Sequence, residues 1–176
     1  MMNAARVTFL FILSAILSVL TLYQKPEHSL DLQLAIPVGL YFIAALLLSL
    51  RPRVSWDAQL QFAGLALAVW LVLFSVSYNL LFFVLAPISG GLGAWLTCWL
   101  GRRFLDLSWP RLWPIAITGV GAAVLGVLFM IAVRGLPKDT FTIGLKAGVI
   151  AGLWQIGVGW QMARKLGMQE NPRIEN

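Results

Sequence analysis

The stretch QLQFAGLALAVWLVLFSVSYNLLFFVLAPISGGLGAWLTCWL, residues 59–100, contains no charged residue. A single helix of that length would be about 63 Å long, roughly twice the thickness of the hydrocarbon core of a bilayer. The turn-forming segment SYN at 77–79 would divide it into two helices of ordinary length, whereas a break at APISGG, residues 86–91, would leave too short a second helix. The stretch therefore predicts two transmembrane helices, at about 59–77 and 80–100.

The rest of the chain has the same character. Of its residues, 60% are hydrophobic and 11% are charged, whereas a soluble domain carries about 25% charged residues. Further apolar runs predict spans at about 5–23, 32–50, 111–133 and 142–163. We interpret the first run as a retained helix, since no small-residue cleavage site precedes Gln24. The predicted fold class is all-α: one domain, residues 1–176, forming a polytopic integral membrane protein with a bundle of six transmembrane helices.

The connecting segments contain signals for helix ends. Ser55 and Ser108 are expected to cap the helices that follow them, and Gly101 is expected to end the fourth span. Pro87, early in that span, predicts either a simple kink or a short unwound turn of the kind that binds substrate in transporters.

Basic residues predict the orientation, because cytoplasmic loops are enriched in Lys and Arg. Most lie on one side of the predicted bundle: Arg6, Arg51, Arg53, Arg102, Arg103, Arg111, Arg164, Lys165 and Arg173. Only Lys25, Arg134 and Lys138 lie on the other side. Five tryptophans fall near the basic side, as interfacial residues do: Trp56, Trp99, Trp109, Trp113 and Trp160. We expect an inner (cytoplasmic) membrane protein with both termini in the cytoplasm.

Small residues recur at helical spacing in the last three spans. Gly144, Gly148 and Gly152 are four residues apart in GLKAGVIAGLWQ, residues 144–155. Such a stripe lets a neighbouring backbone approach closely, and Gly93 and Gly119 add small residues to the fourth and fifth spans. We expect these three spans to form a closely packed centre, with the first three more peripheral. The stripe would serve either packing within the chain or docking of another membrane subunit.

The candidate substrate-binding residues lie on the same three spans. Gln155 falls near the middle of the last span, where its amide needs a partner from another helix or a bound solute. Trp154, and Ser89 with Gly90 just after Pro87, would complete the site. Lys146 lies on the opposite face from the glycine stripe. It would either extend to the interface or sit at the outer rim of the site.

The residue inventory predicts no enzyme, no metal site and no cofactor. Cys98 and His28 are the only residues of their kinds, which excludes a thiolate cluster and bis-histidine haem ligation within the chain. The segment ISGG at 88–91 resembles the Gly-x-Ser-Gly motif of rhomboid-type proteases. Here Pro87 replaces the first glycine, and no histidine in the last span can activate Ser89. The basic charges sit in short loops, so no nucleic acid is expected.

Two functions remain as expectations. The first is small-solute transport, or service as a membrane substrate-binding subunit. The size and helix count resemble the substrate-binding membrane subunits of energy-coupling-factor vitamin transporters. Those subunits carry an Ala-x-x-x-Ala pattern in their first helix, where this chain has Ser14 and Ser18, so the resemblance is one of architecture. The alternative is a structural or accessory subunit, or an assembly factor, of a larger membrane complex. The expected partners are the lipid bilayer, other subunits on small-residue faces, and a small solute.

Overall fold

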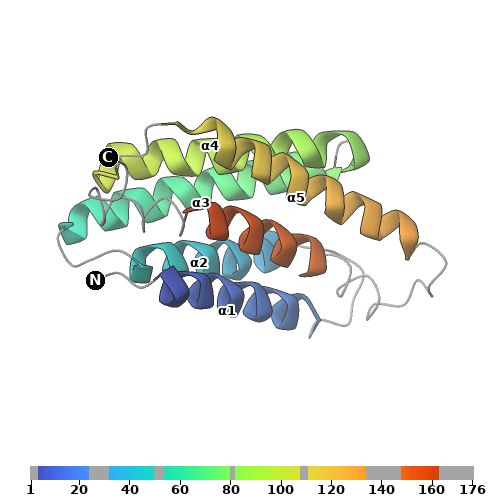
Figure 1. Ribbon diagram of the computed structural model, residues 1–176, viewed down its shortest axis with the longest axis horizontal. Coiled ribbons are helices and arrows are strands. Elements are labelled where there is room, and N and C mark those ends of the chain that lie inside the picture. Colours follow the sequence, from blue (N-terminus) through green and yellow to red (C-terminus); the bar gives the residue numbers. More distant parts are fainter. Residues whose placement is uncertain are drawn as a thin grey trace, which may run out of the picture.

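A computed structural model describes residues 4–23, 32–49, 54–79, 82–107, 111–133 and 148–162, and within them every regular element is a helix. The helices lie side by side along the long axis of the bundle (Figure 1). They are α1 (Ala4–Tyr23), α2 (Leu32–Ser49), α3 (Trp56–Asn79), α4 (Phe82–Phe104), α5 (Trp113–Ala132) and a sixth helix at residues 148–162. The all-α prediction is confirmed.

The long uncharged stretch is divided close to the predicted place. Helix α3 ends at Asn79 and α4 begins at Phe82, so the alternative break at residues 86–91 lies inside a helix. Helix α4 is continuous through Pro87. Pro87 has no N–H group, so the carbonyl oxygen of Phe83, four residues earlier in the first turn, loses its usual donor, but the helix continues on both sides. The unwound turn considered for this segment is therefore not formed.

The prediction that the fourth span ends at Gly101 is wrong. Helix α4 extends to Phe104, and the amide N–H groups of Leu105 and Leu107 donate to the carbonyl oxygen of Gly101, at 3.0 and 3.4 Å. Asp106 has a φ of 50°, in the left-handed region that short polar side chains tolerate better than most. The helix thus stops where Asp106 turns the chain.

One of the two predicted caps is confirmed and the other is wrong. The amide of Ala58 donates to the Ser55 hydroxyl oxygen at 3.4 Å, at the start of α3. Helix α5 instead begins after Leu112, which makes no side-chain capping bond, and a proline occupies its first turn. Ser108 lies too far upstream to cap that helix, and the residue itself is outside the described ranges.

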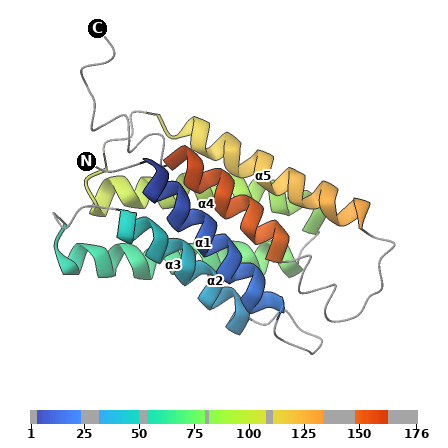
Figure 2. The same cartoon turned by 60° about the horizontal axis from the view of Figure 1, so that its bottom comes forward.

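The sixth helix lies at the centre of the bundle, between α1 and α2 on one side and α4 and α5 on the other (Figures 1 and 2). A methyl group added at Gly148 would lie 2.9 Å from the Cα atom of Val19 in α1. Gly152 faces the same part of α1. The expectation that the first three helices are peripheral is therefore wrong for α1, which packs directly on the glycine stripe.

Helices α4 and α5 approach each other through glycines. A methyl group at Gly90 would lie 2.7 Å from the carbonyl oxygen of Gly119, and one at Gly91 would lie 2.5 Å from the side chain of Val120. Only a hydrogen fits between these backbones. Close packing of the fourth and fifth helices, which the small residues predict, is present in the structure.

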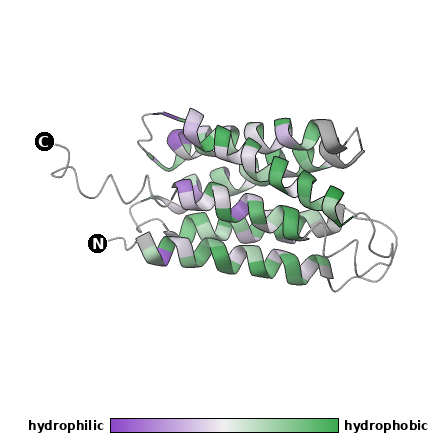
Figure 3. Cartoon of the chain, turned by 45° about the vertical axis from the view of Figure 1, so that its right-hand side comes forward, coloured by the Kyte–Doolittle hydropathy of each residue, from purple (hydrophilic) through white to green (hydrophobic). Residues whose placement is uncertain are grey.

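Apolar side chains cover the outside of the bundle and also fill its interior. Among the described residues, three helices are long and apolar enough to cross a membrane: Ala5–Leu22, Trp56–Val76 and Trp113–Ala132. The second of these, in α3, is 11% buried, against 33% for each of the other two, so α3 is the most peripheral. Hydrophilic colour gathers mainly at one end of the bundle (Figure 3). The described charged residues all belong to helix ends or connections on that side: Arg6, Asp57, Arg102, Arg103, Asp106 and Arg111.

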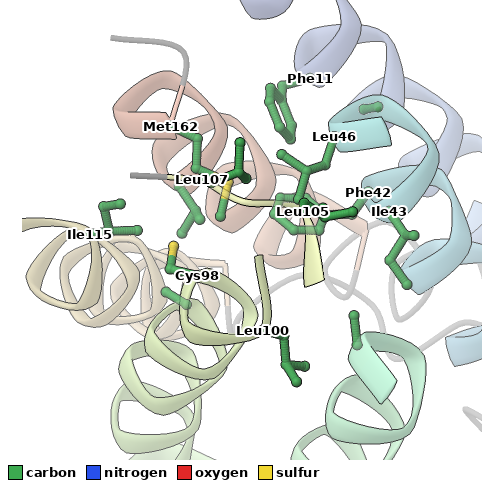
Figure 4. Close-up of a cluster of buried hydrophobic side chains, with 14 of the residues drawn as sticks. Phe11, Phe42, Ile43, Leu46, Cys98, Leu100, Leu105, Leu107, Ile115 and Met162 are labelled. Carbon is green, nitrogen blue, oxygen red and sulfur yellow. The ribbon is translucent and has the colours of Figure 1, made fainter. Parts of the chain in front are cut away.

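The same end contains a compact apolar core. Cys98 of α4, Ile115 of α5 and Met162 of the sixth helix lie together there (Figure 4) and are each fully buried. Leu105 and Leu107, on either side of the turn at Asp106, point into this core. Each buried leucine contributes about 1.5–3 kcal/mol relative to an exposed one in water, so the connection after α4 is held firmly against the bundle.

Candidate functional site: a polar and aromatic centre

The side chain of Gln155 forms a buried polar centre between three helices. It has no exposed surface. Its amide oxygen accepts hydrogen bonds from the hydroxyls of Ser14, at 2.8 Å, and Ser18, at 3.2 Å, both in α1. Its amide nitrogen donates to the Ser18 oxygen at 3.0 Å and to the carbonyl oxygen of Val38 in α2 at 3.1 Å.

Every hydrogen-bonding position of the Gln155 amide thus has a partner within reach. A primary amide offers two lone pairs and two N–H groups, and four contacts match them. Ser18 has one hydroxyl hydrogen and two acceptors for it, Gln155 and the backbone oxygen of Ser14 at 2.9 Å. The centre therefore has two alternative hydrogen-bond arrangements with the same heavy-atom positions.

The neighbouring residue, Trp154, lies about 100° away around the sixth helix and faces α4 as well as aromatic rings of α2 and α3. Its indole N–H donates to the carbonyl oxygen of Gly90 in α4 at 2.9 Å. Gly93, one turn further along α4, lies beside the ring: a methyl group there would be 3.7 Å from it, an ordinary van der Waals contact. Two consecutive residues therefore connect the sixth helix by hydrogen bonds to three others: Gln155 to α1 and α2, and Trp154 to α4.

A second tryptophan makes the same kind of bond in another pair of helices. Trp70 of α3 donates from its indole N–H to the carbonyl oxygen of Ala35 in α2 at 2.8 Å. Its ring occupies the space above Gly39, where an added methyl group would lie 2.5 Å away. In both cases the acceptor lies within three residues of a helix proline, Pro37 or Pro87.

The aromatic rings form one continuous row through the bundle. Ring centroids are 5.3 Å apart for Phe11 and Phe42, 5.0 Å for Phe42 and Trp154, and 5.6 Å for Trp154 and Trp70. Phe74 extends the row along α3, with its centroid 6.0 Å from that of Trp70. These tilted pairs lie in the distance range where aromatic contacts stabilise beyond simple burial. The row connects α1, α2, the sixth helix and α3.

The structure brings together several of the residues that the sequence singles out. Trp154 contacts Gly90 and Gly93, Gly90 contacts Gly119, and Gln155 lies beside Trp154 on the next position of the helix. Ser89 is partly buried next to Gly90. Gly148 and Gly152 lie against α1 and are separated from this contact by the width of the helix. Gly144 and Lys146 lie outside the described residues.

Sequence reasoning missed several participants in this centre, among them Ser14, Ser18 and Trp70. Ser14 and Ser18 are named from the sequence only because they stand where vitamin-transporter subunits carry the alanines of their docking pattern. Trp70 is not named from the sequence at all. A signal for the serines was present, because they are four residues apart and so share one face of an otherwise apolar helix. No comparable signal identified the Val38 carbonyl, since every residue carries one.

The chemistry available at this centre is hydrogen bonding by neutral groups. Within the described ranges, the buried residues include no Asp, Glu, Lys, Arg or His. The same ranges contain no group of three or more His, Cys, Asp or Glu side chains suited to a metal ion. The described residues of the centre therefore offer hydrogen bonds from uncharged groups, and no acid, base or nucleophile pair.

Comparison with protein families, curated proteins and solved structures finds no match to this chain. Its functional class must therefore be argued from the geometry of the bundle itself.

Proposed function

We propose that the protein is an integral membrane protein of the cytoplasmic membrane whose six helices cross the bilayer. The distribution of side chains supports this proposal. Large apolar residues such as Phe9, Leu60 and Leu128 are more than half exposed, whereas Ser14, Ser18 and Gln155 are buried. A water-soluble bundle would reverse that arrangement, because exposing contiguous apolar surface to water is unfavourable.

The proposed orientation places the charged end of the bundle in the cytoplasm, since cytoplasmic loops are enriched in Lys and Arg and all the described arginines lie at that end. Single-cysteine labelling in intact cells tests it, starting from Cys98→Ala to remove the only native thiol. Ser55→Cys should resist an impermeant maleimide, and Lys138→Cys should react with it. The reverse result would invert the topology, and recovery of the protein in the soluble fraction after carbonate washing would refute membrane insertion.

Within this class, we assign the protein to small-solute transport or to a membrane substrate-binding subunit. The observation that supports this assignment is the buried set of hydrogen bonds between Gln155 and Ser14, Ser18 and the Val38 carbonyl, where three helices meet. Polar side chains are costly inside a membrane and commonly mark a solute site. In the closed arrangement the protein groups satisfy one another, and a solute would replace the Ser18 and Val38 contacts of the amide.

The neutral lining indicates the class of solute. A charged ligand would have no counter-charge among the buried described residues and would pay a large desolvation penalty. An uncharged molecule with one donor and one acceptor, such as an amide or a nitrogen heterocycle, would match the amide of Gln155 and gain stacking on Trp154 or Phe42.

Thermal stability in mild detergent tests the transport assignment, because a ligand that binds only the folded state raises the unfolding temperature. A panel of small uncharged amides, polyols and heterocycles should contain at least one compound that stabilises the wild type. Gln155→Leu should abolish that response, and Gln61→Leu, the same change at an exposed position in α3, should retain it. An equal response in both variants would exclude Gln155 from the site.

The exposed small residues of α3 favour the alternative function, an accessory subunit of a larger membrane complex. Gly64 has open space around it, and Ala68, one turn later, is exposed. This small-residue pair is the kind that lets a second helix approach closely, and α3 is the least buried of the three long apolar helices. A stable partner that co-purifies in mild detergent and is lost in Gly64→Leu would support this alternative over transport.

A further inference from the structure

The charged end of the bundle carries arginines that form no ion pair with another described residue. Arg6 at the start of α1, Arg102 and Arg103 at the end of α4, and Arg111 before α5 are all exposed. The two carboxylates at this end that the structure describes, Asp57 and Asp106, form no ion pair with any of them. Four guanidinium groups thus remain free, among the described residues, to meet an anion from outside the bundle.

Three of these arginines belong to one firmly packed pair of helices. Helices α4 and α5 are in backbone contact at Gly90 and Gly119. Their ends near the arginines are tied together by Leu105, Leu107 and Ile115 in the buried core. Arg102, Arg103 and Arg111 therefore emerge from adjacent, fixed helix ends. The first turn of α5 also carries no acidic residue, so nothing described there neutralises them.

Exposed indoles mark the depth at which these arginines lie. Trp99 precedes Arg102 and Arg103 by about one turn on α4, and Trp113 follows Arg111 at the start of α5. Trp99 is 47% exposed and Trp113 is 73% exposed. Tryptophan favours the boundary between hydrocarbon and head groups. Guanidinium groups one turn beyond that boundary reach the level of lipid phosphates, which arginine binds with two parallel hydrogen bonds.

We propose that the cytoplasmic end of the α4–α5 pair binds the phosphate-bearing head group of an anionic phospholipid. Arg102, Arg103 and Arg111 contact the phosphate, and Trp99 and Trp113 flank the acyl chains. The opposite charge of the two surfaces, and the indoles at head-group depth, select a lipid over a soluble anion. The inference rests on the proposed membrane location, but not on transport.

Lipid titration of the purified protein in neutral detergent, followed by native mass spectrometry, tests the inference. Phosphatidylglycerol should bind more tightly than phosphatidylcholine. Arg103→Gln should weaken phosphatidylglycerol binding about five-fold, the effect expected for one arginine near an anionic surface. The charge-matched control Arg6→Gln, at the same end but on α1, should weaken it by less than two-fold, roughly the limit for a diffuse, screened charge. Equal losses in the two variants would show a diffuse charge effect and overturn the site.

Two further measurements keep the outcomes distinct. Arg103→Lys retains the charge but cannot form the paired hydrogen bonds, so it should bind less tightly than wild type and more tightly than Arg103→Gln. Inorganic phosphate alone should not displace the lipid; displacement at millimolar phosphate would identify a soluble-anion site and overturn the lipid proposal. If the protein fractionates with membranes yet does not distinguish the two lipids, this inference fails while the membrane location stands.

Discussion

The hydroxyl of Ser14 in α1 donates a 2.8 Å hydrogen bond to the amide oxygen of Gln155 in the sixth helix, 141 residues later. This bond joins the first helix of the chain to the last. It helps to hold α1 against the central sixth helix, although the bulky apolar residues of α1 alone suggest a peripheral helix. The glycine stripe of the sixth helix brings the two backbones close enough for the bond to form.

Replacing Gln155 with leucine should destabilise the bundle. The substitution leaves Ser18 and the Val38 carbonyl without their amide partner, although both keep alternatives within their own helices. We expect a loss of about 0.6–2 kcal/mol, the range measured for hydrogen bonds between helices in membranes. Unfolding in mixed micelles of increasing SDS content measures it. Gln61→Leu, an exposed position, should change stability by less than half as much; an equal change would argue against the polar centre as a structural bond.

The contact between α4 and α5 predicts a sharp difference between two glycines on one helix. A methyl group at Gly119 would collide with the carbonyl oxygen of Gly90, whereas one at Gly121 meets nothing within 4 Å. Gly119→Ala should cost about 1–3 kcal/mol, as overpacking does. Gly121→Ala should be neutral or slightly stabilising, because alanine favours a helix more than glycine does. Unfolding midpoints of the two variants provide the comparison, and similar midpoints would contradict the packing.

Loss of the indole N–H of Trp154 should be measurable on its own. Trp154→Phe keeps an aromatic ring in the row with Phe42 but removes the bond to the Gly90 carbonyl. The expected cost is about 0.5–1.5 kcal/mol, the net value of a typical hydrogen bond. Trp160→Phe, on the same helix with half of the side chain exposed, is the matched control. If Trp160→Phe is the more harmful change, the bond to α4 does not contribute.

Tight packing of α1 on the sixth helix predicts that a second mutation can relieve the first. A methyl group at Gly159 would overlap the ring of Phe11, so Gly159→Ala should destabilise by about 1–3 kcal/mol. Adding Phe11→Leu should recover part of the loss, because the smaller side chain vacates the overlapping volume. A double-mutant cycle measures the coupling. Strict additivity of the two changes would show that the residues are not in contact.

The helices themselves were predictable from local sequence. Each apolar run is about as long as a bilayer is thick, and charged or turn-forming residues separate the runs. Those features are local, so the division of residues 59–100 near Asn79 and the capping role of Ser55 could be inferred without a fold. The end of α4 was misjudged because Gly101 lies within a helix whose termination depends on Asp106, in a conformation that its residue type only weakly favours.

The arrangement of the helices was decided only by the tertiary structure. An amphipathic helix in water shows by its apolar stripe which face points inward. These helices are apolar all round, so their sequences do not show it. Close approach at Gly148 selects α1 as the neighbour of the sixth helix, and only then does Gln155 meet Ser14. By itself, the amino-acid sequence determined that this chain is a set of apolar helices with a basic end. Which polar groups meet inside depends on backbone contacts between residues far apart in the chain.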